Sequence, residues 1–153
     1  MLTDVTTCEE QKKQFKEKRP NNPIEALVCS STWPNLVANP NAKMPKEMET
    51  FTKEFETFYK NLPMYQSKVV QWILSEGKGE VLAVFNKARY ILDVKTYQIS
   101  ILLRFNESPE YNFGKLKELV GINEELLSEY LSIFTTIVPV LKRGDASKKV
   151  RLN

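Results

Sequence analysis

The spacing of apolar residues changes several times along this chain of 153 residues. Residues 4–18 are polar and favour a helix, with Phe15 as their main apolar residue. After Pro45, apolar residues recur every three or four positions as far as Pro63, which predicts one face of an amphipathic helix. The residues on this face are Met48, Phe51, Phe55, Phe58 and Leu62.

Shorter apolar segments bounded by turn residues predict strands on either side of that helix. The predicted strands are Ile24–Cys29, Lys68–Leu74, Glu80–Phe85 and Arg89–Val94. The turns between the last three are predicted at Gly77–Gly79 and Asn86–Ala88, and they suit an antiparallel meander. The third of the four strands carries apolar residues on both faces, so we expect it to be covered on both sides.

Helical spacing returns after Thr96 and predicts three further helices. The second of these ends at Gly121, and Asn123 caps the third. A hairpin is predicted over Val140–Leu152. Three helices followed by a hairpin are typical of a winged helix. The predicted fold class is therefore α+β, with a small antiparallel sheet and a packed helix over residues 1–95 and a winged-helix domain over residues 96–153.

The sequence contains no histidine, and this restricts the kinds of active site and metal site that the chain could form. It excludes a Ser–His or Cys–His nucleophile pair, an imidazole base and a histidine-ligated zinc ion. Glu9–Glu10 and Glu124–Glu125 are adjacent pairs whose side chains diverge on a helix, so neither predicts an acid–base pair. We expect no catalytic residues, no bound metal and no cofactor.

Cysteine usage and hydropathy indicate an intracellular protein. Cys8 and Cys29 lack metal-ligand spacing, and free thiols are favoured over a disulfide between them. The first residues have no basic region followed by an apolar stretch, so they do not predict a secretory signal. No apolar run approaches the roughly 20 residues that span a bilayer. The expected location is the cytoplasm and the nucleus, without membrane attachment.

The net charge of +3 gives weak support for nucleic-acid binding, because acidic and basic residues are mixed along most of the chain. A winged-helix nucleic-acid-binding domain is nevertheless the alternative function. Against it, the exposed positions predicted for the third helix include Glu124, Glu125 and Glu129, which phosphate would repel. The basic residues near the end of the chain are Lys142, Arg143, Lys148, Lys149 and Arg151.

Several segments carry a resemblance to a known family, and they occur in the order found there. They are Leu2–Val5, the Trp-Pro turn Ser30–Pro34, the helix Met44–Tyr59, the pair Val70–Trp72 and Gly79–Val81, and Arg89–Asn106. The last is the best match, because a Tyr-containing strand runs into the helix start Thr96-Tyr97-Gln98. In these segments the chain resembles the cullins. The Trp-Pro and Tyr-Gln matches favour an ordinary cullin over the cullin-like subunit of the anaphase-promoting complex.

The resemblance implies a scaffold subunit of a multisubunit ubiquitin ligase that has no catalytic activity. Residues 1–95 would be the end of the cullin helical bundle and the α/β cullin-homology subdomain, and residues 96–153 the first winged helix. We expect an internal piece of a cullin. It lacks the N-terminal repeats that carry the adaptor and the C-terminal winged helix with its modifiable lysine, so no neddylation site is expected in it.

The partner implied by the resemblance is the RING-box protein, which inserts an extended strand into the cullin sheet. That protein recruits the ubiquitin-conjugating enzyme, an indirect partner. The residues expected to contact the strand are Leu27, Val70, Trp72, Val81, Leu82, Tyr90 and Leu92. For Trp72, Leu82 and Tyr90, the alternative is ordinary packing of the sheet against the helix that contains Phe51 and Phe58.

Overall fold

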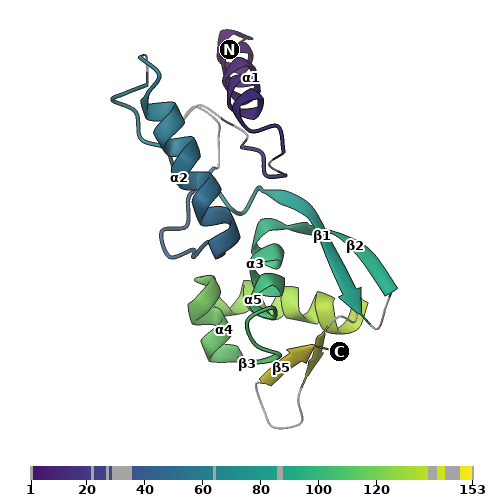
Figure 1. Cartoon of the computed structure of the whole chain (residues 1–153). Helices are drawn as coiled ribbons and strands as arrows, with labels where there is room; N and C mark the ends of the chain where they lie inside the picture. Colours follow the sequence, from purple (N-terminus) through teal and green to yellow (C-terminus); the bar gives the residue numbers. More distant parts are fainter. Residues whose placement is uncertain are drawn as a thin grey trace. The chain divides into compact units, whose positions relative to one another are not determined.

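The computed structural model describes residues 2–21, 23–26, 28, 36–63, 65–85, 88–137, 141–143 and 149–152 (Figure 1). The chain divides into two compact units. The first unit comprises Met1–Val37 and Lys46–Trp72, and the second comprises Ala38–Pro45 and Ile73–Asn153. The predicted functional boundary after residue 95 stays a prediction. The Trp-Pro turn lies outside the described residues.

The predicted α+β class is confirmed. The helices are α1 (Leu2–Lys18), α2 (Lys46–Lys60), α3 (Thr96–Arg104), α4 (Phe113–Val120) and α5 (Glu124–Ser132), which continues as π-helix over Ile133–Ile137. The strands are β1 (Lys78–Phe85), β2 (Ala88–Lys95), β3 (Glu110–Asn112), β4 (Leu141–Arg143) and β5 (Lys149–Leu152). They form one two-stranded and one three-stranded antiparallel sheet.

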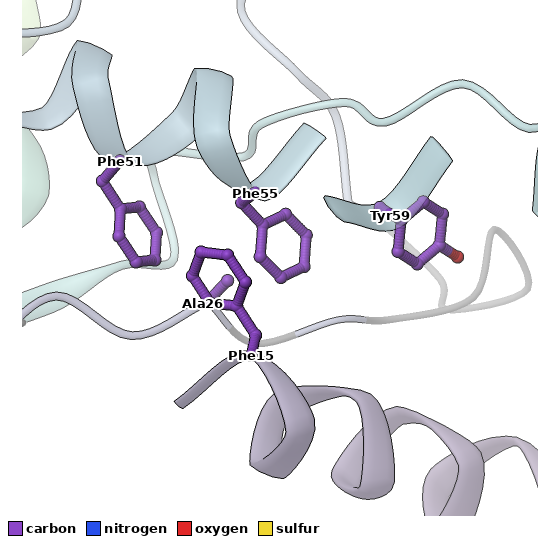
Figure 2. Close-up of a cluster of buried hydrophobic side chains, with 5 residues drawn as sticks. All are labelled: Phe15, Ala26, Phe51, Phe55 and Tyr59. Atoms are coloured by element: carbon purple, nitrogen blue, oxygen red, sulfur yellow. The ribbon is translucent and has the colours of Figure 1, made fainter. Parts of the chain in front are cut away.

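An aromatic cluster forms the core of the first unit (Figure 2). Phe15 of α1 points toward Phe51 and Phe55 of α2, with ring centroids 5.6 and 5.1 Å away. Both contacts have the edge-to-face geometry that aromatic pairs prefer. The buried face of α2 also includes Thr52 and Tyr59. The spacing that predicted this helix therefore placed its inward face correctly at Phe51 and Phe55.

Charged side chains connect α1 to the segment around Glu25 that follows it. The Glu25 carboxylate lies 2.8 Å from the Lys12 ammonium and also pairs with Lys16. Hydrogen bonds from these two lysines lower the pKa of Glu25 from 4.5 to about 2. The carboxylate therefore stays ionised well below the usual range of a glutamate.

Two of the predicted strands are corrected by the structure. The described residues of 24–29 form no strand, and residues 68–74 are not a strand either. Val70 and Trp72 pack partly buried against the aromatic cluster, whereas Val69 is 85% exposed. Val70 and Trp72 contact the cluster while the residues between and before them are exposed, so packing on one side gives the alternation that predicted a strand.

The β1–β2 hairpin belongs to the second unit and packs near α3. The Thr96 amide donates a hydrogen bond of 2.9 Å to the Gly77 carbonyl, and a Cβ atom at Gly77 would lie only 2.2 Å from the Thr96 Oγ1. A Cβ atom at Gly79 would lie 3.2 Å from Ile99 Cδ1. The glycines thus allow the start of β1 to approach α3 closely. The turn predicted at 77–79 is wrong, because Lys78 and Gly79 already belong to β1.

The rest of the second unit packs α3, α4 and α5 with the sheet ordered β3-β5-β4 (Figure 1). Its fully buried side chains include Ile101, Leu116, Leu127, Phe134 and Leu141. Asn123 caps α5 as predicted, since its Oδ1 accepts from the Leu126 amide at 2.8 Å. Three helices and a hairpin are therefore present in the predicted order, with β3 as an additional strand. The assignment of this arrangement as a winged helix stays a prediction.

The end of α4 is attached to residues 39–43 of the same unit. Gly121 has a φ of 72°, the left-handed conformation that favours glycine at the end of a helix. Its carbonyl accepts from Asn39 Nδ2 at 3.1 Å, and the Val120 carbonyl accepts from the Lys43 amide at 3.0 Å. A Cβ atom at Gly121 would lie 1.8 Å from the Asn41 carbonyl oxygen. Only glycine fits this position without displacement of the segment.

Candidate partner-binding surface

One face of the β1–β2 hairpin is exposed along its whole described length. The strands are antiparallel, and alternate residues on each strand share a face. The residues on this exposed face are Lys78, Glu80, Leu82 and Val84 of β1, and Arg89, Ile91, Asp93 and Lys95 of β2. We call this set the exposed face.

Apolar side chains lie in the middle of the exposed face. Leu82 is directly opposite Ile91, and their side chains are 59% and 70% exposed. Val84 is next along β1 and is also 59% exposed. Single exposed apolar residues are common on proteins, but three neighbours on a narrow hairpin form a patch of the kind that marks interaction sites.

The opposite face of the hairpin is partly covered. Val81 pairs with Leu92 on this face, and both are half-buried. Tyr90 pairs with Ala83 nearer the end of the hairpin and is 51% exposed. The middle of β1 is therefore covered on one face and exposed on the other, which corrects the prediction that it is covered on both.

Neither strand of the hairpin pairs with a further strand among the described residues. Each therefore has an edge whose backbone amide and carbonyl groups are not engaged in a described sheet. Such an edge is a template for strand addition. A two-stranded hairpin is also marginally stable unless other elements pack against it. An added strand would use the open edge and bury part of the apolar patch.

The predicted contact residues are distributed between the two units. Val81, Leu82, Tyr90 and Leu92 all lie in the hairpin of the second unit. Leu27 lies outside the described residues. The structure therefore brings four of the seven predicted residues together in one hairpin.

The remaining two predicted residues lie in the first unit. Val70 packs partly buried on the aromatic cluster. The centroid of the Trp72 ring lies 6.4 Å from that of Phe51 and 5.6 Å from that of Phe55. The Trp72 Nε1 donates a hydrogen bond of 2.8 Å to Glu56 Oε1. Packing against α2 thus accounts for much of the position of Trp72. The predicted single sheet containing Val70, Val81 and Leu92 is wrong, because the segment around Val70 is not a strand.

Sequence reasoning missed Val84 and Ile91 as members of the apolar patch. Val84 could have been identified from the alternation within β1, because it is two residues after Leu82 and therefore lies on the same face. Ile91 required the cross-strand register, which a two-residue connection between Phe85 and Ala88 defines. The pattern of both strands taken together would have identified the patch.

Within the ranges that the structure describes, no three His, Cys, Asp or Glu residues form a group able to hold a metal ion. No described helix combines the length and apolar character needed to cross a membrane.

Comparison with protein families identifies one family over most of the chain. Residues 27–153 match the model of the cullin alpha+beta domain. The matched range includes α2, both sheets and α3–α5. The exposed face of the hairpin therefore lies within the matched domain.

Individual relatives agree with this result. Cullin-1 of Schizosaccharomyces pombe is 26% identical over 166 aligned residues, which cover 100% of this chain and 21% of the relative. Cullin-3A of Arabidopsis thaliana is 23% identical, with 98% of this chain and 21% of the relative covered. Cullin-4A of Mus musculus is 27% identical, with 86% and 18% covered. The chain spans about a fifth of the length of these relatives.

Proposed function

Because this chain belongs to the cullin family, we propose that it is a non-catalytic part of a cullin–RING ubiquitin ligase scaffold. In this proposal, the β1–β2 hairpin docks the RING-box protein by accepting an extended strand. The observation that carries the proposal is the exposed Leu82–Ile91 pair on a hairpin whose edges are open among the described residues.

Two physical contributions favour strand addition at this hairpin. Backbone hydrogen bonds to an open edge supply affinity that depends little on sequence. Burial of Leu82, Val84 and Ile91 adds a hydrophobic contribution of about 25 cal/mol per Å² of apolar surface removed from water. Ordering of the incoming strand opposes both terms. The apolar patch therefore supplies the part of the affinity that a polar hairpin would lack.

The scaffold would act through proximity. A docked RING-box protein would hold the ubiquitin-conjugating enzyme near a substrate, and this arrangement raises the rate by fixing the orientation of the reactants. The chain would supply no reacting group. Such a role is consistent with an intracellular protein of the cytoplasm and the nucleus.

Nucleic-acid binding receives less support from the surface of α5. The side chains of Glu124, Glu125 and Glu129 are all exposed on this helix. A helix that enters a groove of DNA needs basic or neutral side chains there, because phosphate contacts dominate affinity. We therefore favour strand docking over the alternative function.

Size-exclusion chromatography of the chain mixed with RING-box protein tests the proposed function. We expect a complex that elutes ahead of either protein alone. Separate elution of the two proteins, at concentrations well above the dissociation constants typical of stable interfaces, would reject docking. A parallel gel-shift titration with duplex DNA addresses the alternative, which requires a shift that weakens steeply as salt is raised.

A further inference from the structure

Four of the five charged residues on the exposed face form rows of like sign, and the fifth, Arg89, lies opposite Val84. The register pairs Lys78 with Lys95 and Glu80 with Asp93, and all four residues are exposed. Like charges directly opposite one another destabilise a strand pair, although diagonal neighbours of opposite sign offset part of this cost. We call the two pairs the basic row and the acidic row.

These four side chains have no ion-pair partner within the part of the chain that the structure describes. Elsewhere in the described chain, charged side chains do form pairs, such as Arg19 with Glu54 at 2.6 Å. The rows therefore keep their charges available for a ligand. A third row, Leu82 with Ile91, follows the acidic row and is apolar.

Each row contains one residue from each strand, so both strands present the rows in the same order from the base of the hairpin to its tip. From the base of the hairpin toward its tip, the face is basic, then acidic, then apolar, with successive rows about 7 Å apart. A strand added to either edge places alternate side chains beside these rows. The same sequence requirement thus applies at the edge of β1 and at the edge of β2 for a strand that runs from the base of the hairpin toward its tip, parallel to β1 and antiparallel to β2.

We propose that the rows select the sequence of the added strand. The favoured segment carries an acidic, a basic and an apolar residue at alternate positions, with the basic residue in the middle. Its two intervening residues are apolar, because they lie beside the rows Gly79–Val94 and Val81–Leu92 of the opposite face. The selection rests on the proposed strand-docking function and adds to it the chemistry of the segment that docks.

Two short fluorescent peptides of identical composition test this selection. One has Glu-Val-Lys-Val-Leu at its centre, and the other has Lys-Val-Glu-Val-Leu. Fluorescence anisotropy with the whole chain at low salt measures the dissociation constants. Replacing two attractive contacts by two repulsive ones should weaken binding on the order of tenfold. Added salt should reduce the difference, because the charges are exposed.

The matched variant exchanges the two rows without changing the net charge. It combines Lys78→Glu and Lys95→Glu with Glu80→Lys and Asp93→Lys. We expect it to prefer the second peptide by a similar factor, with an unchanged circular dichroism spectrum. Equal binding of the two peptides, binding of neither, or an unaltered preference in the variant would each overturn the selection. So would a dimer of the chain that the row exchange abolishes, since the rows would then serve a second copy.

Binding of RING-box protein to the same two chains separates this inference from the proposed function. If RING-box protein binds both chains equally and the peptides are not distinguished, the row selection fails while docking stands. If the peptides are distinguished but RING-box protein does not bind, the selection stands and the assigned partner is wrong.

Discussion

Leu82 lies directly opposite Ile91 in the β1–β2 register, and both side chains remain mostly exposed. On the other face of the same hairpin, Val81 and Leu92 are half-buried. The exposed face therefore has more apolar surface left for a partner to bury than the opposite face has. An exposed apolar pair beside an open edge is the feature from which strand docking follows.

Polar substitution of the exposed pair should weaken partner binding without unfolding the hairpin. In the double variant Leu82→Thr and Ile91→Thr, strand propensity is kept and apolar area is lost. We expect the affinity for RING-box protein to fall roughly tenfold to a hundredfold, because each side chain loses on the order of 1 kcal/mol of burial on docking. Isothermal titration calorimetry measures the change.

Val69→Thr is the matched control for this variant. Val69 is also an exposed apolar residue, but it lies in the first unit and outside the hairpin. Its replacement should leave the affinity within error. Equal losses in the control and the double variant would show that the exposed pair has no special part in docking.

Gly121→Ala should destabilise the second unit strongly. The substitution places a Cβ atom against the Asn41 carbonyl oxygen at a left-handed position. We expect a loss of about 2 kcal/mol or more in the free energy of unfolding, measured by urea denaturation. Gly114→Ala is the control, because its Cβ atom would meet only Asn112 Oδ1 at 3.5 Å in the first turn of α4. That variant should be neutral or slightly stabilised.

Trp72→Phe should remove a hydrogen bond while keeping an aromatic ring on α2. The Nε1 donor to Glu56 is lost, whereas contacts with Phe51 and Phe55 are largely kept. We expect a destabilisation of about 1 kcal/mol by circular dichroism in urea. Glu56→Gln keeps an acceptor and should cost less. A larger loss for Glu56→Gln than for Trp72→Phe would contradict this role of the indole.

Acidification should weaken the contribution of Glu25 to stability. Its pKa is lowered on folding by Lys12 and Lys16, so the contribution is fully present above pH 4.5 and is lost as the pH falls toward about 2. Wild-type protein should therefore melt at a higher temperature than Glu25→Gln near neutral pH, and the two should converge near pH 2. A difference that persists unchanged at pH 2 would exclude this cause.

The sequence allowed α2 to be predicted well because its apolar face is long and regular. The spacing of Phe51 and Phe55 identified α2, and Gly121 marked the end of α4 through a conformation that glycine alone adopts readily. The two strands of the hairpin were also predicted. Local pattern and tertiary packing agree at these elements.

Other features depend on contacts that a local pattern does not contain. The segment around Val70 alternates like a strand, but it packs on α2 without a neighbouring strand. Strand β3 has only three residues and is paired with β5, which lies far along the chain. The rows of charge on the exposed face likewise appear only once the register of β1 and β2 is known.

Amide hydrogen exchange of the chain with and without RING-box protein tests strand docking most directly. Backbone amides at an open strand edge exchange with water, and a docked strand protects them. We predict slower exchange within Lys78–Val84 or Arg89–Lys95 on addition of the partner, with exchange in α4 unchanged. A complex that forms while both strands exchange at their original rates would contradict docking at the hairpin.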